Sequence, residues 1–295
     1  MTNLGRLITA MVTPFNDDFS LNIDETIKLA NYLVDNGTDT VLLAGTTGES
    51  PTLTHNEEYS IFKEVSRSLA GKAKVMAGTG SNCTQTAIES TQAAEKCGVD
   101  SILQVVPYYN KPSQEGMYQH FKAVADSTSL PILLYNIPGR TGINMEPETM
   151  ARLADIDNII GVKEAAGSVD QVKAIRQETP DDFLIYSGDD GLTLDFMEAG
   201  ACGVVSVAAH CVGLEIQSMM SAFVDGDQEK ARSIQDRLNR LFDVLFITSN
   251  PVPVKVALSL MGHAVGPTRL PLVSATPDEI SKIQDVLNSV VIPAS

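Results

Sequence analysis

Short apolar runs alternate along the chain with longer stretches in which apolar positions recur every three or four residues. Runs that are apolar on both faces are typical of strands in a helix-covered parallel sheet, and the wider spacing is typical of amphipathic helices. The runs predict strands at residues 7–13, 40–43, 75–77, 101–105, 132–135, 159–163, 183–186 and 203–206. The stretches after them predict helices at residues 24–36, 54–70, 84–97, 113–127, 146–154, 169–177, 192–199 and 214–225.

This alternation predicts an α/β fold, and right-handed crossovers make closure into a (β/α)8 TIM barrel the simplest arrangement. An open doubly wound sheet is the alternative. No unit carries the Gly-x-Gly-x-x-Gly turn of that fold, and residues 78–80 match it only in part. Asp24 should cap the first helix and Gly37 should end it. Thr54 should cap the second helix, with Glu57 at capping-box spacing.

The alternation stops after residue 226. Residues 229–248, 254–261 and 277–290 each have the spacing of a helix, and no apolar strand pattern lies between them. We therefore expect a barrel over residues 1–226 and a C-terminal three-helix appendage over residues 227–295. No low-complexity linker separates the two parts, so the appendage should pack on the barrel.

Composition and charge exclude several classes of function. Hydrophobic residues make up 43% of the 295 residues, which is enough for a full core. The formal net charge of −16 argues against a nucleic-acid or anionic-membrane surface, because such a surface needs clustered Lys and Arg. The four cysteines form no Cys-x-x-Cys pair, which indicates neither a disulfide frame nor a structural metal and fits a reducing cytoplasm. We expect no secretion signal and no membrane span.

The sixth predicted strand ends in a lysine, Lys163, where a turn is expected. Burial at the mouth of an apolar barrel disfavours the ammonium form, and a neutral amine is a nucleophile toward ketones. Schiff-base chemistry is therefore one interpretation of Lys163. The alternative is a lysine whose stem lies along the barrel while its charge reaches water.

Other polar residues also fall at strand ends, where the active sites of such barrels lie. They are Thr46 and Thr47 after the second strand, Tyr108 and Tyr109 after the fourth, Tyr135 and Arg140 at the fifth, and residues 187–191 after the seventh. Taken singly, they fit ordinary turns and a barrel rim, and the last loop lacks a P-loop pattern for phosphate. Taken together, Lys163 and Tyr135 would supply an amine and a proton-transfer hydroxyl. The backbone of residues 45–48 and the Arg140 side chain would hold carboxylates.

Six motifs, at residues 45–50, 108–111, 135–142, 161–164, 250–255 and 269–272, occur in an order that extends over nearly the whole chain. They resemble the class I, lysine-dependent pyruvate aldolase/lyase superfamily and, within it, the dihydrodipicolinate synthase family. The resemblance implies a cytoplasmic lyase that condenses pyruvate with L-aspartate 4-semialdehyde to 4-hydroxy-tetrahydrodipicolinate, the first committed step of diaminopimelate and lysine biosynthesis. It also implies a homotetramer made of two tight dimers, without cofactor or metal.

The resemblance implies four catalytic residues. Lys163 matches the Schiff-base nucleophile and Tyr135 the proton-transfer group. Thr46 matches the residue that links Tyr135 to Tyr109. Tyr109 itself would reach into the active site of a neighbouring subunit.

It also implies four substrate-binding residues. Thr47 is similar to the residue that helps to hold the pyruvate carboxylate, and Arg140 to the one that orients the semialdehyde carboxylate. Gly188 and Val205 match positions whose backbone lines the pyruvate pocket.

Many members of the family are inhibited by L-lysine at a dimer cleft. The residues here that match its contacts are Ser50, His55, Asn82 and Tyr108. The match fails at Glu58 and Thr86, where sensitive members have a histidine and a glutamate. Because Thr86 offers no carboxylate to the ammonium of the effector, we predict weak or absent inhibition by L-lysine.

Two alternative functions remain. A sister enzyme such as N-acetylneuraminate lyase or a 2-keto-3-deoxy sugar acid aldolase would need the same Lys163 and Tyr135, and Asp189 and Asp190 could bind sugar hydroxyls. A non-catalytic keto-acid sensor would be marked by loss of the lysine, the tyrosine or a threonine, and the sequence retains all of them.

Overall fold

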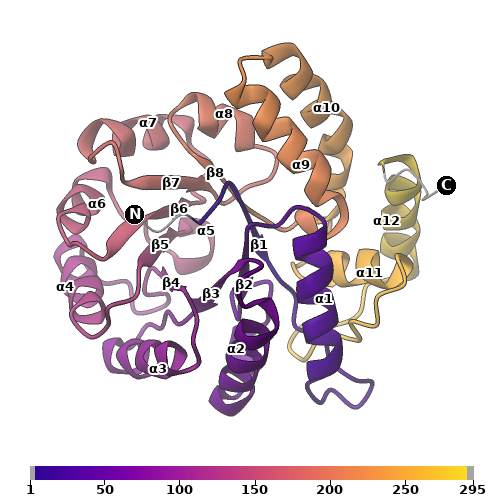
Figure 1. Cartoon of the computed structure of the whole chain (residues 1–295), viewed down its shortest axis with the longest axis horizontal. Coiled ribbons are helices and arrows are strands. Elements are labelled where there is room, and N and C mark those ends of the chain that lie inside the picture. The colour runs from indigo at the N-terminus through magenta and orange to yellow at the C-terminus, as the bar shows by residue number, and fades with distance from the viewer. Residues whose placement is uncertain (1–3, 291–295) are drawn as a thin grey trace.

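A computed structural model describes residues 4–290 and contains a closed barrel of eight parallel strands (Figure 1). The strands are β1 (Leu7–Ala10), β2 (Thr40–Leu43), β3 (Lys74–Gly78), β4 (Ser101–Val105), β5 (Ile132–Asn136), β6 (Ile159–Glu164), β7 (Leu184–Ser187) and β8 (Gly203–Ser206). Each strand pairs with its neighbours in sequence, and β8 pairs with β1. The predicted TIM barrel is confirmed.

Helices cover the outside of the barrel and continue beyond it. In the barrel they are α1 (Ile23–Asp35), α2 (His55–Leu69), α3 (Thr84–Lys96), α4 (Gln114–Ala125), α5 (Pro138–Thr141), α6 (Pro147–Ala154), α7 (Val169–Glu178), α8 (Thr193–Glu198) and α9 (Ala209–Val224). The last three are α10 (Gln228–Val244), α11 (Val252–Leu260) and α12 (Pro277–Val290). The short helix α5 and a 3-10 turn at Ser50–Thr52 were not predicted, because each is far shorter than the window of about 11 residues over which a hydrophobic period can be recognised.

Helix caps test the local sequence signals. Thr54 and Glu57 form the predicted capping box of α2. The predicted cap of α1 was wrong, because the side chain of Asn22, not Asp24, accepts a hydrogen bond from the backbone N–H of Glu25. Helix α9 begins five residues earlier than expected, at Ala209, whose backbone N–H bonds to the Ser206 hydroxyl at 2.8 Å.

The core has two layers. One lies between strands and helices, and the other fills the barrel, with Ile8, Leu42, Met76, Leu103, Leu133, Tyr135, Tyr186 and Val205 among its members. Lys163 pairs with Tyr135 on one side and with Tyr186 on the other. Because paired residues of parallel strands share a face, this register directs Lys163 into the barrel.

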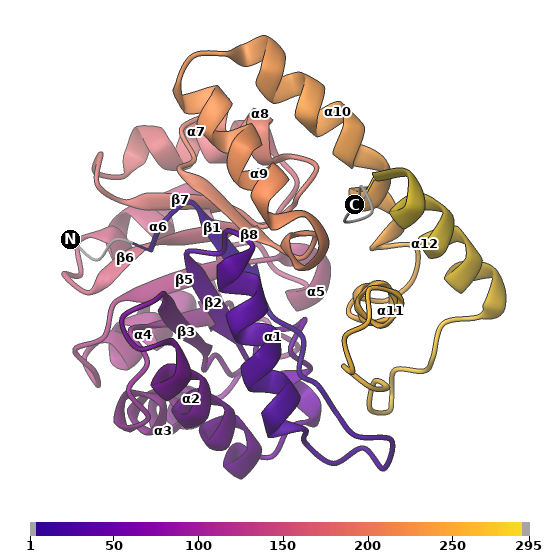
Figure 2. The same ribbon diagram turned by 45° about the vertical axis from the view of Figure 1, so that its right-hand side comes forward.

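The C-terminal helices lie together to one side of the barrel (Figure 2). Helix α10 packs against α9, and α12 packs against α10 and α11. The backbone after α11 also lies close to the backbone after β1, since a Cβ added to Gly266 would lie 1.9 Å from the carbonyl oxygen of Phe15. No helix within residues 4–290 is long and apolar enough to cross a membrane.

Candidate active site

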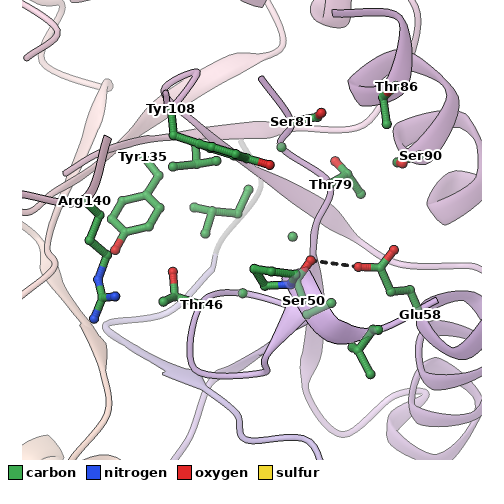
Figure 3. Close-up of a pocket in the computed structure, with 18 of the residues that line it drawn as sticks. Thr46, Ser50, Glu58, Thr79, Ser81, Thr86, Ser90, Tyr108, Tyr135 and Arg140 are labelled. Carbon is green, nitrogen blue, oxygen red and sulfur yellow. Dashed lines mark hydrogen bonds between the residues drawn. The ribbon is translucent and has the colours of Figure 1, made fainter. Parts of the chain in front are cut away.

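A cavity of about 460 Å³ lies at the C-terminal ends of β2 to β5 (Figure 3). Its walls include Thr46, Thr79, Thr86, Tyr108, Tyr135 and Arg140. These residues come from loops far apart in sequence, and barrel closure brings them together. The cavity therefore lies where the active sites of TIM barrels are found.

Lys163 lies against the ring of Tyr135, behind the wall of this cavity. Its Nζ is 4.3 Å from the ring centroid, and the residue is 7% exposed. Burial lowers the pKa of Lys163 to about 8, although the charge of Asp190 opposes the shift and that of Arg140 adds to it. About a tenth of the Lys163 side chain is thus a neutral amine at pH 7, a far larger share than for a solvated lysine, and this neutral form is the nucleophile.

Tyr135 lies beside this amine on the neighbouring strand β5, in register with Lys163. Burial raises the pKa of Tyr135 to about 12, while the charge of Arg140 and a hydrogen bond with Thr46 act in the opposite direction. The phenol therefore stays protonated near neutral pH and can donate as well as accept a proton. The hydroxyl groups of Thr46 and Tyr135 point toward one another (Figure 3).

The loop after β2 places Thr47 in a buried position, 3% exposed. Its Oγ1 accepts a hydrogen bond of 2.9 Å from Nδ2 of Asn250. The same loop is fixed from the other side by the Thr13 hydroxyl, which donates to the carbonyl of Gly48 at 2.6 Å.

Gly188, directly after β7, borders the lysine, and Val205 lies on β8. A Cβ on Gly188 would lie 3.1 Å from Cε of Lys163 and 2.7 Å from Cβ of Ala165, so only glycine leaves the amine stem undisturbed. Val205 pairs with Ile8 and belongs to the interior cluster.

Arg140 is exposed and extends from α5 into the cavity. The loop that carries it is held by a buried amide, Asn136. Its Nδ2 donates to Glu164 Oε2 at 3.0 Å and to Asn144 Oδ1 at 2.7 Å, and its Oδ1 accepts from the backbone N–H of Met145 at 3.0 Å. Arg140 thus carries its guanidinium on a long side chain, while hydrogen bonds hold the loop beneath it in place. This arrangement suits the binding of a substrate carboxylate.

Tyr109 is not brought to the other predicted catalytic residues within this chain. It is 89% exposed and has a left-handed backbone, with φ of +73°. Its neighbour Tyr108 lines the cavity instead.

Asp190 does not offer a carboxylate to a sugar substrate. It is 4% exposed, and its Oδ2 accepts from the backbone N–H groups of Val207 and Ala208, each at 3.0 Å. Its Oδ1 is hydrogen-bonded to the Ser206 hydroxyl. Burial raises the pKa of Asp190, and its bonds fix the turn between β8 and α9.

The far end of the cavity holds three of the four predicted effector contacts, Ser50, His55 and Tyr108. Glu58 contacts two of them: its Oε1 accepts a hydrogen bond from the Ser50 hydroxyl at 2.8 Å (Figure 3), and its Oε2 lies 3.2 Å from Nδ1 of His55. Burial raises the pKa of Glu58. The backbone carbonyl of the fourth residue, Asn82, accepts a hydrogen bond of 2.8 Å from Nδ2 of Asn110.

Sequence reasoning missed the contacts of Asn250, Lys255 and Glu49 with the site. The motif at residues 250–255 carried part of the resemblance, but no pattern in it indicated a contact with residues 45–50. Among residues 4–290, no group of three or more His, Cys, Asp or Glu side chains is arranged to hold a metal ion.

Comparisons with known proteins show the family of the chain. The Dihydrodipicolinate synthetase family matches residues 3–290. The 4-hydroxy-tetrahydrodipicolinate synthase of Acaryochloris marina is 56% identical over 288 residues, covering 97% of this chain and 98% of that one. That of Moorella thermoacetica is 55% identical over 283 residues, covering 96% and 97%.

Two solved structures are similar throughout. The dihydrodipicolinate synthase of Bacillus anthracis has a TM-score of 0.97 at 48% identity, covering 99% of this chain and 100% of that one. The enzyme of Cyanidioschyzon merolae, solved with lysine bound, has a TM-score of 0.96 at 49% identity, covering 97% and 98%. The chain belongs to the dihydrodipicolinate synthetase family.

Proposed function

We propose that Lys163 of this chain forms a Schiff base with pyruvate, which then condenses with L-aspartate 4-semialdehyde to give 4-hydroxy-tetrahydrodipicolinate. The chain is a lyase, and its relatives at 52–56% identity carry the name of this activity. The observation that carries the proposal is the buried amine of Lys163, 4.3 Å from the Tyr135 ring centroid.

The first step joins the neutral Lys163 amine to the keto carbon of pyruvate. Tyr135 donates a proton to the carbonyl oxygen as the carbon–nitrogen bond forms and later helps to remove water from the carbinolamine, which leaves the imine. Loss of a methyl proton then gives an enamine, whose carbon attacks the aldehyde of the second substrate. The amino group of that substrate then attacks the imine carbon, which closes the ring and releases Lys163 as the free amine. The Tyr135 hydroxyl regains its proton through Thr46, with which it shares a hydrogen bond.

The two substrate carboxylates are assigned to different residues. Thr47 and the backbone at Gly188 and Val205 hold pyruvate, while Arg140 pairs with the carboxylate of the semialdehyde. Tyr109 completes the proton relay in the site of a neighbouring subunit, which requires at least a dimer and fits a homotetramer. Its exposure of 89% supports a role outside its own chain.

Substrate turnover and lysine labelling test this function together. Incubation with pyruvate and borohydride should add the reduced pyruvate adduct to the peptide that contains Lys163, as read by mass spectrometry. Lys255 is the other buried lysine within residues 4–290. Labelling of Lys255 would assign the nucleophile to that residue and leave the reaction class unchanged. Turnover of N-acetylneuraminate or a 2-keto-3-deoxy sugar acid in preference to aspartate semialdehyde would overturn the substrate assignment.

The far end of the cavity is proposed to bind L-lysine. The expectation of weak inhibition rested on the departures at Glu58 and Thr86. The Glu58 carboxylate, however, is buried and lines the same cavity, where it offers the ammonium of lysine the carboxylate that Thr86 lacks. A relative at 49% identity was solved with lysine bound. A lysine titration should show inhibition, and Glu58→Gln should raise the half-inhibitory concentration by at least about tenfold, since a charge-assisted bond is lost. Full activity of the parent chain at millimolar lysine would restore the original expectation.

A further inference from the structure

Three residues of the C-terminal region contact the loop after β2. Asn250 donates to the Thr47 hydroxyl at 2.9 Å. Lys255 and Arg269 converge on Glu49, with the Lys255 Nζ 2.8 Å from Oε1 and the Arg269 backbone N–H 2.9 Å from Oε2. The C-terminal region therefore reaches the loop that is assigned to the pyruvate carboxylate.

The Asn250 contact determines the direction of the Thr47 hydroxyl. A hydroxyl that accepts a hydrogen bond keeps its own proton free to donate elsewhere. Within residues 4–290, Asn250 is the hydrogen-bond partner of Thr47 Oγ1, and no protein acceptor takes the Thr47 proton. Both side chains are buried, so water does not compete at this contact. The free proton is available to an anion in the pocket.

The Glu49 contacts fix the backbone on which Thr47 stands. Glu49 has a left-handed backbone, with φ of +56°, which is unfavourable for a residue with a side chain. Its carboxylate is 1% exposed and is paired with the Lys255 ammonium. Both cations also contact the ring of Phe15, whose centroid is 4.4 Å from Lys255 Nζ and 4.2 Å from Arg269 Cζ. A buried, paired carboxylate thus holds the turn two residues after Thr47.

We propose that Asn250 is a positioning residue for pyruvate: it holds the Thr47 hydroxyl as a hydrogen-bond donor to the substrate carboxylate. The C-terminal region accordingly forms part of the substrate site and is more than a support packed outside the barrel. This inference rests on the proposed function, in which Thr47 contacts pyruvate. Asn250 acts through Thr47 and takes no part in bond making.

Steady-state kinetics of Asn250→Ala test the proposal. We expect KM for pyruvate to rise on the order of tenfold, the usual effect of losing a hydrogen bond to a charged group. The KM for aspartate semialdehyde and kcat at saturating pyruvate should not change. The matched control is Asn158→Ala, because the Asn158 amide holds carbonyls of Ala125 and Thr128 at the opposite end of the barrel. Its pyruvate KM should equal that of the parent.

A double-mutant cycle separates positioning from general support. In a Thr47→Val background the Asn250→Ala change should leave the pyruvate KM as it is, because the hydroxyl it orients is gone. If Asn250→Ala does not fold, Asn250→Asp replaces it. This variant is nearly isosteric, accepts the Thr47 proton and adds a negative charge, so its pyruvate KM should rise further.

Two results would overturn the inference. One is an unchanged pyruvate KM in either Asn250 variant, and the other is an equal effect of Asn250→Ala with and without the Thr47 hydroxyl. A parent chain that does not turn over pyruvate would instead refute the proposed function, which keeps the two failures distinct.

Discussion

Two buried lysines in this chain have opposite surroundings. Lys255 has a carboxylate partner, Glu49, at 2.8 Å, whereas Lys163 forms no ion pair with any residue in the range 4–290. Burial lowers the pKa of both amines, but the charge of Glu49 acts to keep Lys255 protonated. The unpaired amine is therefore the better nucleophile, and the distinction depends on neighbours that the sequence does not reveal.

The lowered pKa of Lys163 predicts the pH dependence of imine formation. Below its pKa of about 8 the amine is protonated and unreactive, so the trapping rate should rise about tenfold per pH unit and level off above that pH. The rate of borohydride trapping at saturating pyruvate measures this. A rate that keeps rising in the same way up to pH 10 would show an ordinary, solvated lysine.

Removal of the Tyr135 hydroxyl should slow catalysis without unfolding the chain. We expect Tyr135→Phe to lower the rate of imine formation by about 10²–10⁴, the usual contribution of general acid–base catalysis. Tyr186→Phe is the control, since its buried hydroxyl donates to the carbonyl of Gly5, before the first strand. An unaltered rate in Tyr135→Phe would remove this residue from the mechanism.

At the level of elements, the hydrophobic pattern located every strand, because each is a short run buried on both faces. The pattern predicted the ends of helices less accurately where the capping residue was not obvious, as at Asn22. Strand ends also located Lys163, Tyr135 and the two threonines, since barrel topology sends all strand ends to one face. Contacts between loops, such as Glu49 with Lys255, depend on side-chain packing and have no periodic signal.

The Glu49–Lys255 pair should matter for stability as well as for the site. Lys255→Met leaves the Glu49 carboxylate buried without its cation, so the free energy of unfolding should fall by about 3–5 kcal/mol. Urea denaturation measures the loss, and adding Glu49→Gln should recover part of it. The control is Lys282→Met, which breaks an exposed pair with Asp278 and should cost at most about 1 kcal/mol. Equal losses in both variants would contradict a special role for the buried pair.

At the scale of the whole molecule, Tyr109 is the residue that a single chain leaves unused. If it completes the site of a neighbour, Tyr109→Phe and Lys163→Ala subunits should each be inactive or nearly so, yet regain activity in hybrid oligomers. A hybrid site then combines Lys163 of one subunit with Tyr109 of the other.

Mixtures of Lys163→Ala with Tyr135→Phe provide the control for this complementation. Both residues belong to the same subunit's site, so no hybrid contains an intact pair and activity should stay absent. Refolding of the mixed subunits followed by a turnover assay measures both combinations. Failure of the Tyr109 mixture to exceed this background would place Tyr109 outside the relay.

The contact between Thr47 and Asn250 joins residues that are 203 positions apart. During synthesis on the ribosome, all eight strands emerge before Asn250 does. A nascent chain can therefore assemble its ring of strands while the threonine that is to receive pyruvate still lacks its amide neighbour. Competence to bind substrate would then arrive late in the synthesis of each new chain, with about the last sixth of its residues.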